Sequence, residues 1–109
     1  NNIDKFKTDD FYLIKPIKNC SSAYHLFVMI FNSLKRSNEF KNTMQKNGIA
    51  ATFHYVPLHK SKMGKKFCSY RLPITEKIYN RVVRLPLFSD ITNKEFKKIL
   101  YSLNKFMIS

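Results

Sequence analysis

Apolar and other residues alternate along residues 49–56, a stretch bounded by Gly48 on one side and Pro57 on the other. The odd-numbered residues, from Ile49 to Tyr55, would share one side of an extended chain, and this period of two predicts a buried strand. Gly48 permits the positive φ at which helices end, and Pro57 has no N–H for a sheet. The pattern therefore predicts a helix end, a strand and then a loop.

Three further apolar stretches also indicate extended structure. Residues 23–31 are the most apolar run and are apolar on both faces, which predicts a central strand covered on both sides. Residues 82–88 predict another strand, which Pro86 confines to an edge or a bulge. Residues 11–17, interrupted by Pro16, predict a loop or an edge strand.

Helical signals separate these strands. Ser37 is a suitable N-cap for a helix over residues 38–47, in which Phe40 and Met44 are four apart and would face the sheet. Thr75 predicts the start of a short helix over residues 76–81.

The last helix is predicted to begin at Thr92, because Thr92 and Glu95 have the spacing of a capping box. Its buried stripe is expected to comprise Phe96, Ile99, Leu100 and Leu103, together with Phe106 or Met107.

These elements predict an α+β fold, in which helices pack on a small three-stranded sheet. The expected order is strand, helix, strand, long loop, helix, strand, helix. The loop would cover residues 58–73 and be anchored by Phe67 and Tyr70. Residues 11–109 are expected to form one domain, after a frayed or truncated segment over residues 1–10.

Composition narrows the class of protein. The chain has 109 residues and is 44% apolar, which is enough for a core. Its longest apolar run, residues 26–31, is far shorter than the roughly 20 residues that cross a bilayer. The polar start lacks a signal-peptide hydrophobic region. Cys20 and Cys68 show no metal or framework spacing, so we expect reduced cysteines in a cytoplasmic protein, with a single bridge left open.

The formal net charge of +13 raises the question of a polyanionic partner. The densest basic cluster follows residue 59 and comprises Lys60, Lys62, Lys65, Lys66 and Arg71. Three interpretations stay open: solvated polar faces, a patch for a phosphorylated ligand or acidic partner, and a nucleic-acid groove. No recognition-helix or RNA-binding motif supports the last of these.

Candidate chemistry is concentrated around the histidines. His59 follows the Pro57 break and is expected to be a solvent-accessible functional imidazole, or else a loop histidine without a role. His25 would be either a hydrogen-bonded core histidine or a residue facing a ligand. In a strand, His54 and Tyr55 would point to opposite faces. The spacing of the three histidines does not predict a metal site, and no glycine-rich phosphate loop is present.

Five segments resemble, in order and spacing, the C-terminal part of the DegT/StrS-type sugar aminotransferases. They are SAYHLFVM, RSNEFKNTMQKNGI, ATFHYVPLH, LPITEKIYNRVVRLPLF and TNKEFKKIL, within residues 11–107. The segment HYVPLH followed by MGKKF and RLPLF resembles the branch that makes dTDP-4-amino-4,6-dideoxygalactose. The chain departs from the family at Lys62, where a proline is usual, which puts the sugar specificity in question.

The resemblance implies the small C-terminal domain of the aspartate-aminotransferase fold. It implies a homodimeric parent enzyme that uses pyridoxal phosphate to move an amino group from glutamate to C4 of a nucleotide-linked 4-keto-6-deoxy sugar. The family's Schiff-base lysine belongs to a preceding large domain, and no lysine here has that motif. We therefore expect a fragment that holds no catalytic residue and binds no pyridoxal phosphate alone. An alternative is a module that supplies this domain in trans.

The resemblance also implies substrate contacts. Tyr55 and His59 would line the wall of the nucleotide-sugar site, and His25 would hold a supporting position.

Overall fold

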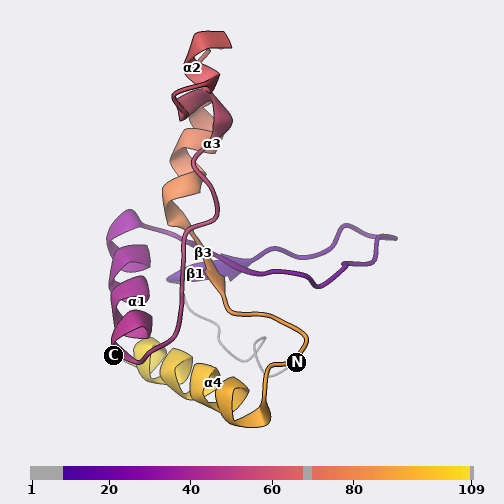
Figure 1. Cartoon of the computed structure of the whole chain (residues 1–109), viewed down its shortest axis with the longest axis vertical. Helices are drawn as coiled ribbons and strands as arrows, with labels where there is room; N and C mark the ends of the chain where they lie inside the picture. The colour runs from indigo at the N-terminus through magenta and orange to yellow at the C-terminus, as the bar shows by residue number, and fades with distance from the viewer. Residues whose placement is uncertain (1–8, 68–69, 109) are drawn as a thin grey trace.

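The computed structural model describes residues 9–67 and 70–108 of the chain. Within them, the elements in chain order are β1 (Phe11–Leu13), β2 (Phe27–Phe31), α1 (Leu34–Lys46), η1 (Leu58–Lys60), α2 (Gly64–Phe67), α3 (Pro73–Ile78), η2 (Tyr79–Arg81), β3 (Val82–Leu85) and α4 (Asn93–Ile108), where η denotes a 3-10 turn (Figure 1). The predicted α+β class, a three-stranded sheet with helices packed on it, is confirmed. Cys68 and most of the predicted frayed start lie outside the described residues.

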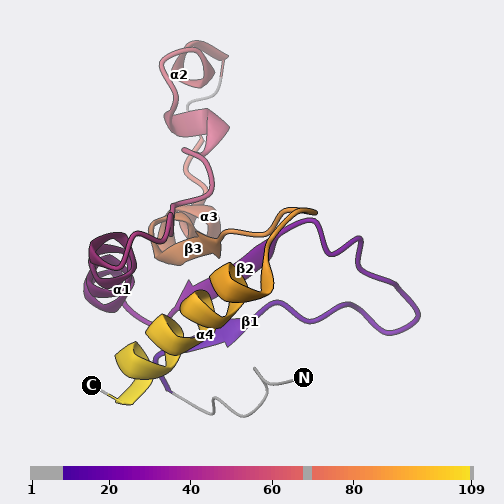
Figure 2. The same ribbon diagram turned by 60° about the horizontal axis from the view of Figure 1, so that its bottom comes forward.

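The sheet has β2 at its centre, with β1 and β3 antiparallel on either side. Leu13, Met29 and Val83 lie opposite one another across the three strands and face the core. Helices α1 and α4 contribute side chains to this core, and Figure 2 shows α4 crossing the sheet. The predicted strands within residues 23–31 and 82–88 are therefore present. The third strand is β1, so of the two alternatives for residues 11–17 the edge strand is the one that forms.

An aromatic cluster joins the sheet to both long helices. The ring of Phe40 on α1 lies 5.0 Å from that of Phe31 on β2 and 5.0 Å from that of Phe106 on α4. Met44, one turn after Phe40, is also fully buried, as the spacing predicted. The Arg36 guanidinium lies 4.0 Å from the centre of the Phe106 ring. The cluster thus ties the end of the chain to the sheet.

Helix α1 begins earlier than predicted. Its N-cap is Ser33, whose hydroxyl accepts a hydrogen bond from the Arg36 N–H, whereas Ser37 lies within the helix and is fully buried. The Ser37 hydroxyl lies 2.9 Å from the Leu34 carbonyl oxygen and 3.2 Å from the Asn80 carbonyl oxygen. The prediction of Ser37 as the N-cap was wrong, because its hydroxyl has an acceptor in a distant segment.

The C-terminal end of α1 confirms the prediction. Gly48 has a φ of +68°, and its N–H donates to the Gln45 carbonyl while the Ile49 N–H donates to the Met44 carbonyl. This pair of bonds defines a Schellman motif, in which the residue after the glycine also packs against the last helical turn. Ile49 and Met44 are both buried in the core.

The predicted strand over residues 49–56 does not form. Only Thr52 makes a bridge, to Arg84 of β3, and the odd-numbered Phe53 and Tyr55 are mostly exposed. Residues beyond Thr52 leave the sheet and run toward α2 (Figure 1). These residues have the period of two that is typical of a strand. A strand also needs a neighbouring strand whose backbone N–H and C=O groups are free to pair along its whole length.

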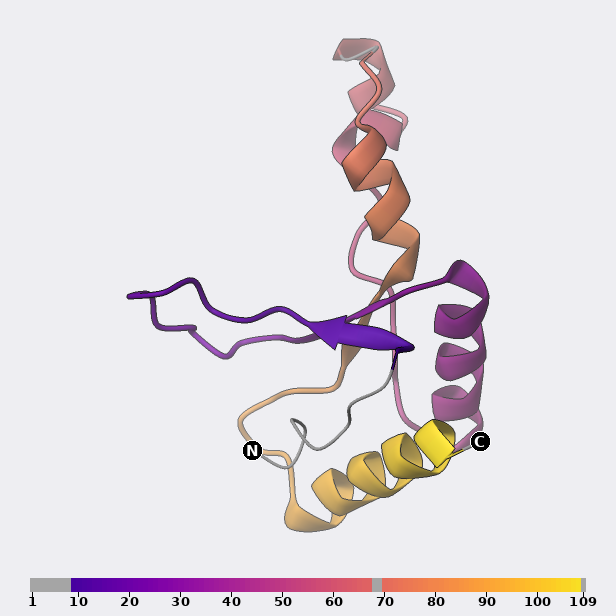
Figure 3. The same ribbon diagram turned by 180° about the vertical axis from the view of Figure 1, so that it is seen from behind.

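The predicted strand over residues 23–31 is shorter than expected. Residues 23–26 belong to an arm, residues 14–26, which extends from the sheet in the direction away from α1 (Figure 3). Tyr24 has a φ of 48° and is 74% exposed. The β2–β3 ladder ends where Phe27 pairs with Leu85, and Pro86 next to it has no N–H to extend the pairing.

The predicted loop over residues 58–73 contains η1 and α2, and it stands away from the sheet together with α3 (Figure 1). Phe67 and Tyr70 are 83% and 77% exposed, so the prediction that these rings anchor the loop was wrong. The following helix begins at Pro73, two residues before the predicted Thr75 cap. Proline suits the first helical position because its missing N–H would have no intrahelical partner.

Helix α4 begins as predicted. The Thr92 N–H donates to Glu95 Oε2 over 2.8 Å, and the Glu95 N–H donates to the Thr92 hydroxyl over 3.2 Å. This reciprocal capping box satisfies two backbone donors at the start of the helix. Of the predicted stripe, Ile99, Leu103 and Phe106 are buried, whereas Phe96 is half exposed and was wrongly included.

Candidate functional site

An open hollow of about 610 Å³ separates the segment after the Thr52 bridge from helix α3. We call it the Tyr55 hollow. One wall is built by residues 54–58, and the other by α3, η2 and the first residue of β3. Its lining residues are His54, Tyr55, Val56, Pro57, Leu58, Ile74, Thr75, Ile78, Tyr79 and Val82. Most of these side chains are apolar, so the hollow suits shape recognition more than charge recognition.

Tyr55 lines this hollow and is largely exposed. It is 68% exposed, and its ring lies edge-on to that of His54 at 4.7 Å. The Arg84 guanidinium lies 5.5 Å from the centre of the Tyr55 ring. The expectation that His54 and Tyr55 point to opposite faces was wrong, because the strand geometry on which it relied is absent.

His59 lies behind the wall instead of in the solvent. Its side chain is only 8% exposed, and its Nε2 lies 3.3 Å from Glu76 Oε1 on α3. The expectation of a solvent-accessible imidazole was therefore wrong. Burial of the ring is possible because the turn η1 directs it toward a carboxylate that can accept its N–H.

Glu76 is a site residue that sequence reasoning missed. The Leu72 N–H donates to its Oε1 over 3.3 Å, and Lys60 Nζ lies 3.9 Å from its Oε2. The pKa of Glu76 lies below its usual 4.5, because the carboxylate accepts the Leu72 N–H first and is then stabilised by the Lys60 charge and the His59 hydrogen bond. An acidic residue in the first turn after a proline was the available sequence signal.

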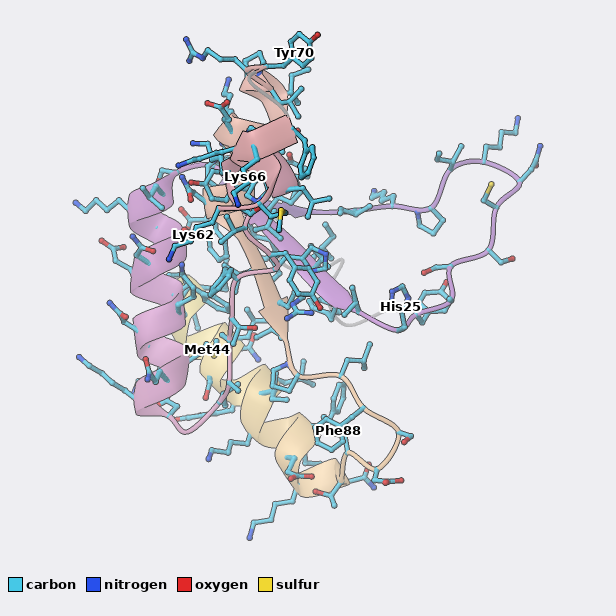
Figure 4. The ribbon with its side chains drawn as sticks, turned by 45° about the horizontal axis from the view of Figure 1, so that its top comes forward. His25, Met44, Lys62, Lys66, Tyr70 and Phe88 are labelled. Carbon is cyan, nitrogen blue, oxygen red and sulfur yellow. The ribbon has the colours of Figure 1, made fainter. Side chains whose placement is uncertain are left out.

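His25 lies apart from this site. It is exposed on the arm, and Figure 4 shows it at the arm's sheet end, away from Lys62 and Lys66. A second hollow of about 920 Å³ lies between the arm and α4, and it is lined by Tyr24 and Leu26 but not by His25. The structure thus places Tyr55 in the wall of the hollow, His59 directly after that wall and outside the lining, and His25 elsewhere.

The basic cluster lies on the projecting part of the molecule. Lys62 precedes α2 and Lys66 lies within it, and Figure 4 shows Tyr70 farther out, at the top of the view. No acidic residue occurs between Leu58 and Ile74 in the sequence. The three interpretations of this charge stay predictions. Lys60 contacts the neighbouring elements, since its Nζ lies 5.3 Å from the centre of the Tyr79 ring and also approaches Glu76.

Within residues 9–67 and 70–108, no three histidine, cysteine, aspartate or glutamate side chains are grouped as metal ligands. None of the helices in that part of the chain combines the length and the apolar character that a bilayer crossing requires. Cys20 is a free, exposed cysteine on the arm.

Curated relatives are similar over most of this chain. A dTDP-3-amino-3,6-dideoxy-alpha-D-galactopyranose transaminase of Aneurinibacillus thermoaerophilus is 27% identical over 85 residues, which are 77% of this chain and 23% of that protein. A UDP-N-acetyl-3-dehydro-alpha-D-glucosamine 3-aminotransferase of Acidithiobacillus ferrooxidans is 26% identical over 77 residues, 70% of this chain and 21% of that protein. The chain thus spans about a quarter of the length of the relatives it matches.

Solved structures show the same fold. The aminotransferase TlmJ of Streptoalloteichus hindustanus matches with a TM-score of 0.80 at 16% identity, over 94% of this chain and 27% of that one. PseC of Helicobacter pylori, an aminotransferase of pseudaminic acid biosynthesis, matches with a TM-score of 0.77 at 20% identity, over 94% of this chain and 29% of that one.

The family assignment rests on the match of a whole-family model. The model of the DegT/DnrJ/EryC1/StrS aminotransferase family matches residues 6–104, which is nearly the whole chain. The fold and the curated relatives agree with it. The chain therefore belongs to the DegT/DnrJ/EryC1/StrS aminotransferase family.

Proposed function

We propose that this chain is the C-terminal small domain of a pyridoxal-phosphate-dependent sugar transaminase. The enzyme would transfer an amino group from glutamate to C4 of a dTDP-linked 4-keto-6-deoxy sugar. The observation that carries the proposal is the family match over residues 6–104, combined with coverage of only about a quarter of each relative. The names of the two curated relatives above refer to amination at C3, so a 3-keto sugar is the alternative acceptor.

Neither of the two hollows is lined by the pair of groups that pyridoxal phosphate needs. Pyridoxal phosphate needs a lysine for its aldehyde carbon and a carboxylate for its pyridine nitrogen. The Tyr55 hollow is lined by neither, and the second hollow is lined by Lys15 but by no carboxylate. We therefore propose that the remainder of the enzyme holds the cofactor, whether in the same polypeptide or as a partner. When bound there, it supplies the electron sink for transamination.

Within such an enzyme, this domain would contribute the wall of the substrate site. Tyr55 is the residue proposed to contact the nucleotide sugar, because its ring is largely exposed and fixed on one side by His54. The phenol offers both an apolar face and a hydroxyl to a deoxysugar. We retain His25 as a proposed supporting contact from the arm.

The test uses the polypeptide in its complete reading frame, combined with a large-domain protein if the frame contains none. Purified protein is supplied with pyridoxal phosphate, glutamate and either the 4-keto or the 3-keto dTDP-6-deoxy sugar. Formation of 2-oxoglutarate and of the amino sugar with the 4-keto substrate is expected. Turnover of the 3-keto sugar alone would move the reaction to C3, and no turnover with either would refute the proposal.

A matched pair of variants tests the role of the wall. Tyr55→Ala is expected to raise KM for the sugar nucleotide about tenfold, as expected for the loss of one aromatic contact together with its hydroxyl. Tyr101→Ala is the control, because Tyr101 is equally exposed, at 68%, but lies on α4. Equal effects of the two substitutions would remove Tyr55 from the substrate wall.

A further inference from the structure

Two neighbouring residues of η1 reach the same carboxylate. His59 Nε2 lies 3.3 Å from Glu76 Oε1, and Lys60 Nζ lies 3.9 Å from Glu76 Oε2. The Leu72 N–H donates to Glu76 Oε1 as well. The carboxylate therefore joins the turn after Pro57 to the first turn of α3.

Burial distinguishes this cluster from an ordinary surface ion pair. The His59 side chain is 8% exposed and that of Glu76 is 22% exposed. Most exposed ion pairs contribute little, whereas a buried polar ring that loses its acceptor is costly. Either the neutral Nε2–H tautomer or the imidazolium of His59 can donate to Glu76.

The position of the cluster determines what it holds together. Residues 54–58 form one wall of the Tyr55 hollow, and His59 and Lys60 follow that wall directly. Ile74, Thr75 and Ile78 on α3 form the opposite wall, and Glu76 lies between them in sequence. The contacts of Glu76 thus connect the two walls of the hollow at one end.

We propose that Glu76 is a positioning residue that, through His59 and Lys60, holds the Tyr55 wall at a set distance from α3. In this proposal His59 affects substrate binding by holding the Tyr55 wall in place, and it does not contact the substrate. The effect on catalysis rests on the proposed function, whereas the effect on the hollow itself does not.

Hydrogen exchange of the chain tests the structural half. The Lys60 N–H donates to the Pro57 carbonyl over 2.8 Å, and the Ser61 N–H donates to the Leu58 carbonyl over 3.0 Å, so both amides report on η1. Glu76→Ala is expected to raise their exchange rates about tenfold, as expected for the net loss of a hydrogen bond to a charged group. His59→Ala should act similarly. His59→Gln should restore protection, because its amide N–H lies near the position of Nε2.

The matched control is Glu95→Gln, which removes a carboxylate from the capping box of α4, far from the hollow. It should leave the exchange of Lys60 and Ser61 unchanged. Unchanged exchange in Glu76→Ala, or equal loosening in Glu95→Gln, would overturn the proposal.

The complete enzyme tests the functional half. Glu76→Ala and His59→Ala should raise KM for the sugar nucleotide more than KM for glutamate, with His59→Gln recovering most of the loss. Loosened exchange with unchanged KM values would overturn the positioning role. If the unmodified enzyme shows no turnover, the proposed function fails, while the exchange data still decide whether Glu76 holds the wall.

Discussion

Replacing Gly48 with alanine tests the turn that directs the chain from α1 toward the Tyr55 hollow. Gly48 has a φ of +68°, and a side chain built there would meet only the flexible Lys98 ammonium, at 3.3 Å. The cost is therefore conformational and not steric. A residue with a Cβ in the left-handed region loses roughly 1–2 kcal/mol, and the stiffer unfolded chain returns about 0.4–1 kcal/mol. The expected net loss is about 1 kcal/mol.

Urea unfolding measures this loss directly. With a slope of about 2 kcal/mol per molar, a loss of about 1 kcal/mol lowers the midpoint by about 0.5 M at an unchanged slope. Gly48→Asn should lose less, because asparagine tolerates the left-handed region. Gln45→Ala, an exposed substitution within α1, is the control and should stay within about 0.5 kcal/mol of the parent.

Two outcomes would contradict this reasoning about Gly48. If Gly48→Ala were as stable as the parent, the Schellman turn would not constrain the chain in solution. If Gly48→Asn were less stable than Gly48→Ala, the cost would be steric, although in the described part of the chain the only atom near the built Cβ is the flexible Lys98 ammonium.

Two further substitutions probe local contacts. Gly64→Ala places a Cβ against the Leu58 carbonyl oxygen, so η1 and α2 must separate. Chemical-shift changes should stay within residues 58–67, and changes at buried core amides would contradict this. The pKa of Glu95 lies below its usual 4.5, because the carboxylate accepts hydrogen bonds first from the Thr92 hydroxyl and then from the Thr92 N–H. Its contribution to stability is therefore present above pH 4.5 and is lost as the pH falls through the folded pKa. The difference in unfolding free energy between the parent and Glu95→Gln should thus shrink as the pH falls below 4.5, and a difference that grows would refute the assignment.

Short-range patterns predicted the parts of the fold that depend on neighbours within one helical turn. The Thr92 and Glu95 capping box, the turn at Gly48 and the buried Phe40 and Met44 all formed as the spacing indicated. The resemblance of five ordered segments also identified the family, which the family model then matched over residues 6–104.

Contacts between residues far apart in the sequence determined the parts of the fold that those patterns did not predict. Ser37 is buried because the Asn80 carbonyl oxygen lies 3.2 Å away, and residues beyond Thr52 leave the sheet. The sequence around a residue does not reveal such partners, because they belong to segments tens of residues away.

The candidate site shows the same division. The sequence by itself determined that His59 follows a proline break, and that Tyr55 and a basic cluster lie nearby. Only the tertiary structure decided that the imidazole turns inward to Glu76, which is 17 residues later in the chain, while Tyr55 stays exposed. The physical reason is that a polar ring is buried only where a hydrogen-bond acceptor from another segment lies beside it. Only folding brings that acceptor and the ring together.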